Sequence, residues 1–242
     1  MYITLRLKKF RSYTALMLVF LLAVWTVLYD GSKTVDASAI LDGPVLIIDA
    51  GHGGEDGGAV SASGVIESGI NLEIALRLDA IAGLYGQRTA MTRETEEIDY
   101  PEDAVTIAQK KKADQHARVE LINSLPDAVL ISIHQNFFPD SRPSGCQVLY
   151  GAGEESEKLG TLTHELLCTS LCPDNRRVAA PISESIYLMK KAQCTAILVE
   201  CGFLSNAAET ELLLTDNYQI KLSAVLMASY MQYRSPADRM DT

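Results

Sequence analysis

The sequence predicts a single-domain α/β protein whose central sheet is mostly parallel and is flanked by helices on both faces. Short apolar runs alternate with longer segments of helical periodicity over residues 44–233, which is typical of a layered α/β fold. Several runs are apolar throughout, as expected for strands that are buried on both sides. The chain has 242 residues, of which 48% are hydrophobic and 21% charged, so it can build one globular domain of ordinary size.

The elements follow one another in alternation. Strands are expected at residues 44–49, 88–93, 128–134, 145–150 and 195–200. Helices are expected at residues 68–84, from about 112 to 123, and at 154–171, 207–213 and 216–233. Ser68 is a candidate cap for the first helix, and Ala117, Leu121 and Ile122 are expected to face the core from the second.

The amino terminus has the pattern of an export signal. A basic flank precedes an uncharged run from Tyr13 to Tyr29, which is intermediate between a signal-peptide core of about 7–15 residues and a spanning helix of roughly 20. Residues 1–30 are therefore predicted to be a signal anchor or a signal peptide. "VDASA" at 35–39 could permit cleavage, but it lies far from the run, so we favour an uncleaved anchor. Residues 31–43 would be a linker, 44–234 the catalytic domain and 235–242 a C-terminal tail.

The charge distribution argues against nucleic acid as a partner. The whole chain has a net charge of −10, and residues 1–30 contribute +3, so the remainder carries −13. A domain this acidic does not attract a polyanion, and it would not adhere to an anionic cell wall by charge. The basic flank predicts that the domain faces the outside, either anchored in the membrane or secreted.

The five cysteines do not have the spacing of a disulfide framework. Cys168 and Cys172 could lie one turn apart on a helix, which would suit a zinc site. No second pair with metal-binding spacing lies near them in the sequence, so buried apolar thiols are the favoured interpretation. The odd number leaves at least one thiol unpaired within the chain.

Unusual polar residues stand where three of the predicted strands end. His52 follows the first strand, His134 ends the third and Glu200 ends the last. Ligands of open α/β sheets bind beyond the carboxyl ends of the strands, so these residues are expected to meet there. Glu67, in the loop after the first strand, is close enough to join them.

Two histidines and one carboxylate leave a fourth position for water, as in catalytic zinc sites. His52, Glu67 and His134 are the predicted ligands, and Glu200 is the predicted general base and acid. Asp49 or backbone carbonyls would orient the imidazoles. Taken singly, each histidine could be a hydrogen-bonded structural residue and Glu67 a solvated loop acid. Glu200 is harder to explain that way, because a carboxylate that ends a buried strand is costly unless it is paired.

Two other interpretations of these residue types are less favoured. The glycines in "GHGGEDGG" could suggest a phosphate-binding loop, but the Gly-Lys-Ser/Thr ending is missing and Glu55 and Asp56 would repel phosphate. His116 and His164 lie in helical, mostly charged surroundings and are expected to be ordinary surface or flanking residues.

Several motifs together resemble the zinc N-acetylmuramoyl-L-alanine amidases of the Amidase_3 family. They are "IDAGHGGEDGGAV", "GVIESGINLEIALRL", "HARVELIN", "LISIHQN" and "ILVECGFLSNAAE", and they occur in order over nearly all of residues 44–233. The resemblance implies that His52, Glu67 and His134 bind Zn²⁺ and that Glu200 is catalytic. Arg118, Asn123 and Asn136 are candidates for substrate contact, although the helical setting of Arg118 suits a structural role equally well.

Within the family, the segment "HQNFFPDSRPSGCQVLY" is similar to the spore germination-specific, CwlD-type branch. That resemblance implies peptidoglycan as the substrate and a location between the spore membranes or in the cortex, and it leaves room for an accessory protein. Phe137 stands where a small residue is commoner in the family, and Thr195 stands where a proline usually precedes the strand. Neither departure removes a predicted metal ligand, so they would affect the shape of the accepted substrate and the local backbone.

The expected reaction is hydrolysis of the amide between the lactyl group of muramic acid and L-alanine. In a spore former, the product would be the precursor of muramic δ-lactam in the cortex. The alternatives are another zinc-dependent peptidoglycan hydrolase, such as a stem-peptide peptidase, and a non-catalytic wall-binding module.

Overall fold

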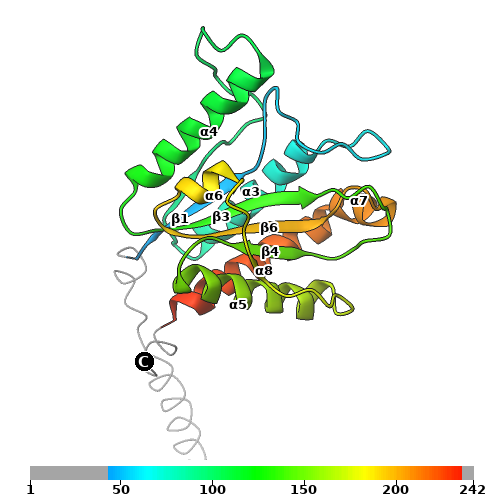
Figure 1. Ribbon diagram of the computed structural model, residues 1–242. Coiled ribbons are helices and arrows are strands. Elements are labelled where there is room, and N and C mark those ends of the chain that lie inside the picture. Colours follow the sequence, from blue (N-terminus) through cyan, green and yellow to red (C-terminus); the bar gives the residue numbers. More distant parts are fainter. Residues whose placement is uncertain (1–42, 236–242) are drawn as a thin grey trace, which may run out of the picture. The chain divides into compact units, whose positions relative to one another are not determined.

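The computed structural model describes residues 43–235, which form a single α/β domain around one six-stranded sheet (Figure 1). The strand order is β2-β1-β3-β6-β4-β5. The strands are β1 (Val45–Ala50), β2 (Thr89–Met91), β3 (Ala128–Asn136), β4 (Gln147–Tyr150), β5 (Ala180–Pro181) and β6 (Thr195–Phe203). The predicted fold class is confirmed. The predictions for residues 1–30, for the linker up to residue 42 and for the tail after residue 235 lie outside the described residues.

The sheet is parallel over β2, β1, β3 and β6 and reverses direction at β4. β1 pairs in parallel with β2 and β3, and β3 pairs in parallel with β6. β4 is antiparallel to β6, and β5 continues beside β4 in the same direction as β4. The carboxyl ends of β1, β3 and β6 therefore meet at one edge, as the sequence predicted.

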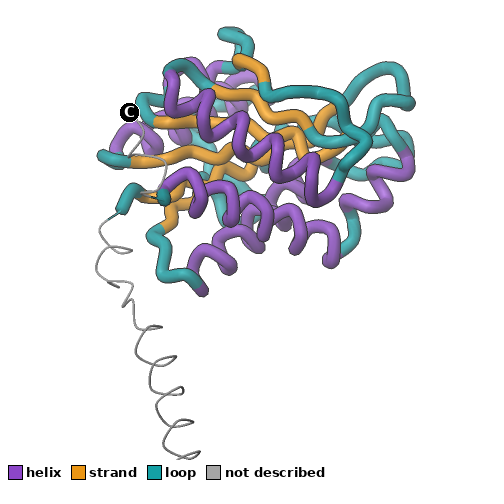
Figure 2. The backbone as a smooth tube through the Cα atoms, turned by 90° about the horizontal axis from the view of Figure 1, so that it is seen from below, coloured by secondary structure: helices purple, strands orange, loops and turns teal. Residues whose placement is uncertain are grey.

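Helices cover both faces of the sheet, as Figures 1 and 2 show. The described residues contain α3 (Glu67–Leu84), α4 (Ile107–Ser124), α5 (Glu154–Leu171), α6 (Tyr187–Lys191), α7 (Ala207–Leu213) and α8 (Asp216–Arg234). α3, α5 and α8 pack together on one face, and α4 and α6 lie on the other. None of the helices in residues 43–235 has the length and apolar character needed to cross a bilayer.

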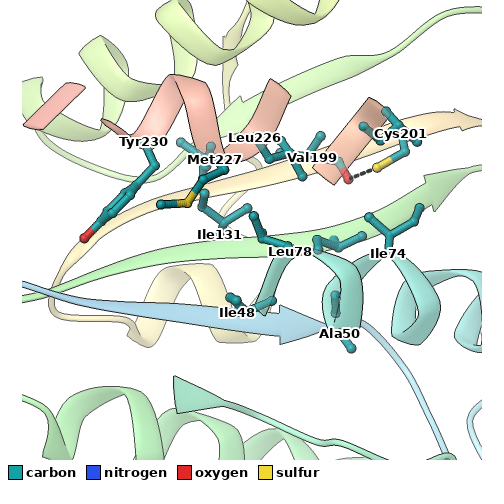
Figure 3. Close-up of a cluster of buried hydrophobic side chains, with 14 of the residues drawn as sticks. Ile48, Ala50, Ile74, Leu78, Ile131, Val199, Cys201, Leu226, Met227 and Tyr230 are labelled. Atoms are coloured by element: carbon teal, nitrogen blue, oxygen red, sulfur yellow. Dashed lines mark hydrogen bonds between the residues drawn. The ribbon is translucent and has the colours of Figure 1, made fainter. Parts of the chain in front are cut away.

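The larger core lies between the sheet and the layer of α3 and α8 (Figure 3). Ile74 and Leu78 project from α3 toward the sheet, and Leu226 projects from α8; all three are fully buried. Ile131 contributes from the middle of β3 and is fully buried as well. This packing fixes the amino end of α3, and therefore Glu67, against the strand ends.

Some local predictions were wrong for identifiable reasons. Ser68 does not cap α3, because the helix begins at Glu67 after Ile66, and the buried Ser68 hydroxyl donates to Glu96 instead. α4 begins earlier than expected, where Thr106 and Gln109 form a capping box. Ala117 is exposed and not in the core, since Arg118 and Ile122 are the residues that α4 buries.

His164 is buried and is not the surface or flanking residue that the sequence suggested. Its side chain is only 3% exposed, and its Nε2 lies 2.8 Å from the carbonyl oxygen of Arg177. His116 is exposed, as expected, and stacks on Tyr187 with ring centroids 5.3 Å apart.

Candidate active site

The three residues predicted at strand ends, and Glu67 from the loop after the first strand, lie together at the carboxyl edge of the sheet. His52 follows β1, Glu67 opens α3, and His134 stands opposite Glu200 in the register of β3 and β6. All four line one cavity of about 410 Å³. The cavity is bounded on its other side by residues of α4 and α6, among them Lys111.

His52, Glu67 and His134 form a cluster that could hold a metal ion. One donor atom from each residue can be chosen so that all three lie within 4.8 Å of one another. Glu67 Oε1 is 3.0 Å from His134 Nδ1, and Glu67 Oε2 is 3.4 Å from His52 Nε2. The two imidazole rings meet edge to face with centroids 5.0 Å apart. Two imidazoles and one carboxylate are a donor set that first-row divalent metals accept, with a further position open to the cavity.

Glu67 is held in its ionised form by the protein around it. The backbone N–H of Ala59 donates to Oε2 at 2.8 Å, and that of Gln135 donates to Oε1 at 3.0 Å. Asn71 donates to Oε1 at 3.2 Å. Burial by itself raises the pKa of Glu67, but the hydrogen bond and charge of His134, followed by His52 and Ala59, lower this pKa to about 2. The carboxylate is therefore ready to bind a cation at neutral pH.

The glycine-rich loop after β1 gives His52 an uncommon backbone conformation. His52 has a φ of +62°, which is rare for a residue with a side chain, and its Nδ1 lies 2.9 Å from Asp56 Oδ2. A Cβ on Gly51 would lie 2.3 Å from the His134 ring, and one on Gly58 would lie 2.5 Å from Glu67 Oε2. The glycines thus let the backbone approach the cluster closely.

Asp49 does not orient an imidazole by a hydrogen bond, contrary to one prediction; Asp56 has that role for His52. Both Asp49 oxygens are already engaged, Oδ1 by Arg118 and Thr92 and Oδ2 by Ser132. Burial raises the pKa of Asp49, but the Arg118 charge, His134 and the two hydroxyls together lower it to about 2. The sequence missed Asp56 because the contact depends on the turn at His52.

Arg118 lines the cavity, but its guanidinium donates its hydrogen bonds to groups of the protein itself. Its Nε donates to Asp114 at 2.9 Å, and one Nη donates to Asp49 and to the Ala50 carbonyl at 2.7 Å each. The other Nη donates to the His52 carbonyl at 2.6 Å. Arg118 is 4% exposed, so its position favours the structural role over substrate contact.

Glu200 differs from the other carboxylates because it lacks a compensating partner. Its Oε2 is buried and has no hydrogen-bond partner among the described residues. Burial raises the pKa of Glu200 to about 7, since the opposing effects of the histidines are too weak to offset desolvation and the nearby Glu67 charge. A carboxyl group with a pKa near neutrality can both accept and donate a proton.

The remaining candidates for substrate contact lie outside the cavity. Asn123 is at the far end of α4, where it donates to the Lys191 carbonyl at 3.0 Å and accepts from the Gln193 N–H at 2.9 Å. Asn136 ends β3, and its carbonyl accepts from the Leu204 N–H at 2.8 Å. Phe137 follows it and is half exposed, beyond the residues that line the cavity.

Comparison with known proteins identifies the family. The model of the Amidase_3 family, described as N-acetylmuramoyl-L-alanine amidase, matches residues 46–229. The chain belongs to this amidase family. The match includes all four residues of the cavity edge, and peptidoglycan is the substrate class that membership of this family implies.

Individual amidases are similar over most of their length. The germination-specific N-acetylmuramoyl-L-alanine amidase of Bacillus subtilis (strain 168) is 34% identical over 194 residues, which cover 80% of this chain and 81% of that protein. The CwlD amidase of Clostridioides difficile, solved in complex with the GerS lipoprotein, has a TM-score of 0.75 and 33% identity; the match covers 78% of this chain and 98% of that one. The amidase AmiC2 of Nostoc punctiforme shares the fold, with a TM-score of 0.66 at 21% identity over 78% of this chain and 96% of that one.

Proposed function

We propose that this amidase hydrolyses the amide between the lactyl group of muramic acid and L-alanine, with Zn²⁺ held by His52, Glu67 and His134. Glu200 would be the group that moves the proton. The observation that carries the proposal is the position of Glu200: a buried carboxyl group with a free oxygen, opposite His134 in the strand register.

The donor set fits zinc. Two neutral imidazoles and one carboxylate with an open fourth position are the usual ligands of catalytic zinc, and Glu67 remains ionised because three N–H groups donate to it. When bound there, zinc supplies a Lewis acid that polarises the scissile carbonyl and lowers the pKa of water. Asp56 fixes the orientation of His52 through Nδ1.

Glu200 performs the proton transfers in this scheme. As a carboxylate it accepts the proton of the attacking water, and as a carboxylic acid it delivers that proton to the departing L-alanine nitrogen. The pKa of about 7 suits both steps, because proton transfer is most efficient when the pKa of the group lies near the working pH. The substrate would occupy the cavity that residues of α4 and α6 border.

For the biological substrate we propose spore cortex peptidoglycan, where the released muramic acid would be the precursor of muramic δ-lactam. The similarity to a germination-specific amidase supports this. We also propose export, anchoring to the membrane through residues 1–30, and an accessory protein. The last is suggested by the related CwlD amidase, which was solved with a lipoprotein.

The test is muropeptide analysis by mass spectrometry with the zinc-loaded protein and its Glu200→Gln variant. The wild type should leave intact glycan and release stem peptides with free L-alanine amino termini, and the variant should be slower by about 10²–10⁴-fold. Cleavage within the stem peptide would instead identify a peptidase, and binding without cleavage would identify a wall-binding module. Wild-type rates in Glu200→Gln would contradict the catalytic assignment.

The cortex proposal needs a separate experiment in the organism. A deletion strain should make spores whose cortex lacks muramic δ-lactam, and expression of the wild-type chain should restore it. Normal cortex with an altered vegetative wall would overturn this part of the proposal while leaving the amidase activity in place.

A further inference from the structure

Three cysteines that do not line the active-site cavity come together in the fold. Cys146 directly precedes β4, Cys168 lies in the last turn of α5, and Cys172 is the residue that caps α5. From the sequence, Cys168 and Cys172 were expected one turn apart on a helix, without a second metal-spaced pair near them, and buried apolar thiols were the favoured interpretation. In the structure the packing of β4 against α5 brings the buried Cys146 to Cys168 and Cys172, which are both partly exposed. All three sulfurs lie within 4.8 Å of one another.

The separations distinguish two possible chemistries for this thiol cluster of Cys146, Cys168 and Cys172. The sulfurs of Cys146 and Cys172 are 3.1 Å apart. Two thiolates on a tetrahedral zinc, each about 2.3 Å from the metal, would be separated by about 3.8 Å. The observed pair is closer than that, so the two sulfurs are in direct contact. His164 Nε2, which lies 3.5 Å from the Cys168 sulfur, already contacts the Arg177 carbonyl at 2.8 Å. A disulfide needs the sulfurs of Cys146 and Cys172 to close to about 2.05 Å, and their contact places them for that bond.

We propose that Cys146 and Cys172 form a reversible disulfide by exchange with an external disulfide, either a small molecule or a thiol–disulfide oxidoreductase. The Cys172 thiolate attacks one sulfur of the donor, and the first donor thiolate leaves. Cys146 then loses its proton and attacks the Cys172 sulfur of this mixed disulfide, and the second donor thiolate leaves. Two protein thiols are oxidised, and one donor disulfide is reduced to two thiols.

The surroundings of the two sulfurs agree with this order of events. Cys172 lines an open cavity of about 640 Å³, so a donor can reach it, whereas Cys146 is 2% exposed. The hydrogen bond with Cys146 lowers the pKa of Cys172 and raises that of Cys146, which burial raises further. Asn175 Nδ2 lies 3.7 Å from the sulfur of Cys146 and 3.9 Å from that of Cys172, as a weak donor to either.

The disulfide would connect the end of α5 to the strand beside the proposed catalytic residue. Gln147, the residue after Cys146, pairs with Glu200 across β4 and β6. On the other side of Cys146, the Gly145 N–H donates to Glu209 at 2.7 Å, and Glu209 also accepts from the Phe203 N–H at the end of β6. The two cysteines are 26 positions apart in the sequence. A disulfide that closes a loop of this length typically stabilises the folded state, so oxidation should raise the Tm by about 5–10 °C.

The test uses the full chain, incubated either with oxidised glutathione or with a reductant, alkylated, and mapped by peptide mass spectrometry without reduction. Oxidation should yield one linked peptide pair, Cys146 with Cys172, and the Tm increase. Cys194→Ser is the matched control, because Cys194 lies in the other core; it should retain both results, and so should Cys168→Ser. Cys146→Ser should lose both.

Several outcomes would overturn the proposal. One is complete alkylation of Cys146 and Cys172 after oxidation of the wild type, which does not depend on whether any variant folds. A second is a Cys168–Cys172 link in place of the expected one. A third is the binding of a second zinc ion per chain that protects the thiols from alkylation and that the Cys146→Ser variant no longer binds.

Discussion

Replacing Arg118 with methionine should destabilise the protein strongly, because the buried ion pair with Asp49 would lose its cation. Arg118 is 4% exposed and Asp49 1% exposed, and their closest atoms are 2.7 Å apart. Removing one partner of a buried pair typically costs about 3–5 kcal/mol of unfolding free energy. The pKa of Asp49 agrees in direction: although burial raises it, the Arg118 charge, His134 and the two hydroxyls together lower it from 3.8 to about 2, which corresponds to roughly 2–3 kcal/mol for all of these contacts together.

The assay is urea unfolding of the metal-free protein, followed by circular dichroism at several pH values. Because folding lowers the pKa of Asp49, its stabilisation is complete above the unfolded value of 3.8 and is lost as the pH falls toward 2. The difference between wild type and Arg118→Met should therefore be about 3–5 kcal/mol at pH 7 and should narrow below pH 4. In the background of Asp49→Asn, Arg118→Met should cost less than in the wild type.

Arg77→Met is the matched control, because Arg77 pairs with Asp216, whose side chain is 84% exposed. An exposed pair contributes about 0–1 kcal/mol, so this variant should unfold almost as the wild type does. The reasoning about Arg118 would be refuted by a loss of less than about 1 kcal/mol at pH 7, or by a difference that does not change with pH.

Three further predictions concern the active site. Chelation of the metal should abolish hydrolysis and added Zn²⁺ should restore it; activity that persists in the metal-free protein would refute the zinc assignment. Gly51→Ala should weaken zinc binding by at least about 10-fold in a competition titration, because the new methyl group would lie 2.3 Å from the His134 ring. The control is Gly83→Ala, which has open space around the new methyl group. This variant should bind zinc normally and be slightly more stable, since alanine favours a helix more than glycine does. Glu200→Gln should stabilise the metal-free protein by about 3 kcal/mol at pH 8: the wild type loses stability as the pH rises from 4.5 to about 7, where it must ionise a buried carboxyl group. At pH 4 the two proteins should unfold alike, and equal stability at both pH values would contradict the raised pKa.

The fold and the clustering of the candidate site residues could be predicted because their signals are local and strong. The buried strands appear as continuous apolar runs, and the carboxyl ends of parallel strands must share an edge, which brought His52, His134 and Glu200 together. β5 and α6 were missed because two and five residues are too short to establish a period.

Other features depend on contacts that no sequence spacing reveals. The contact of His52 with Asp56 and not with Asp49 depends on a turn in which His52, Gly53 and Gly54 all have positive φ. The burial of His164 and the approach of Cys146 to Cys172 depend on how α5 packs against β4. The amide of Asn123 could in principle bind a substrate, but Asn123 lies near the carboxyl end of α4. There its side chain hydrogen-bonds to the backbone of Lys191 and Gln193, just before β6.

The attachment of α4 has a consequence for local unfolding. Of its eighteen residues, α4 buries only Arg118 and Ile122, so polar contacts rather than apolar area hold much of this helix to the sheet. Segments with little buried apolar surface open at a lower free energy than the global transition. Opening of α4 would also release the His52 carbonyl from Arg118. In native-state hydrogen exchange, the amides of α4 should therefore exchange before those of α3 and α8, and the rate at which the site gives up a metal would follow this partial opening and not the unfolding of the core.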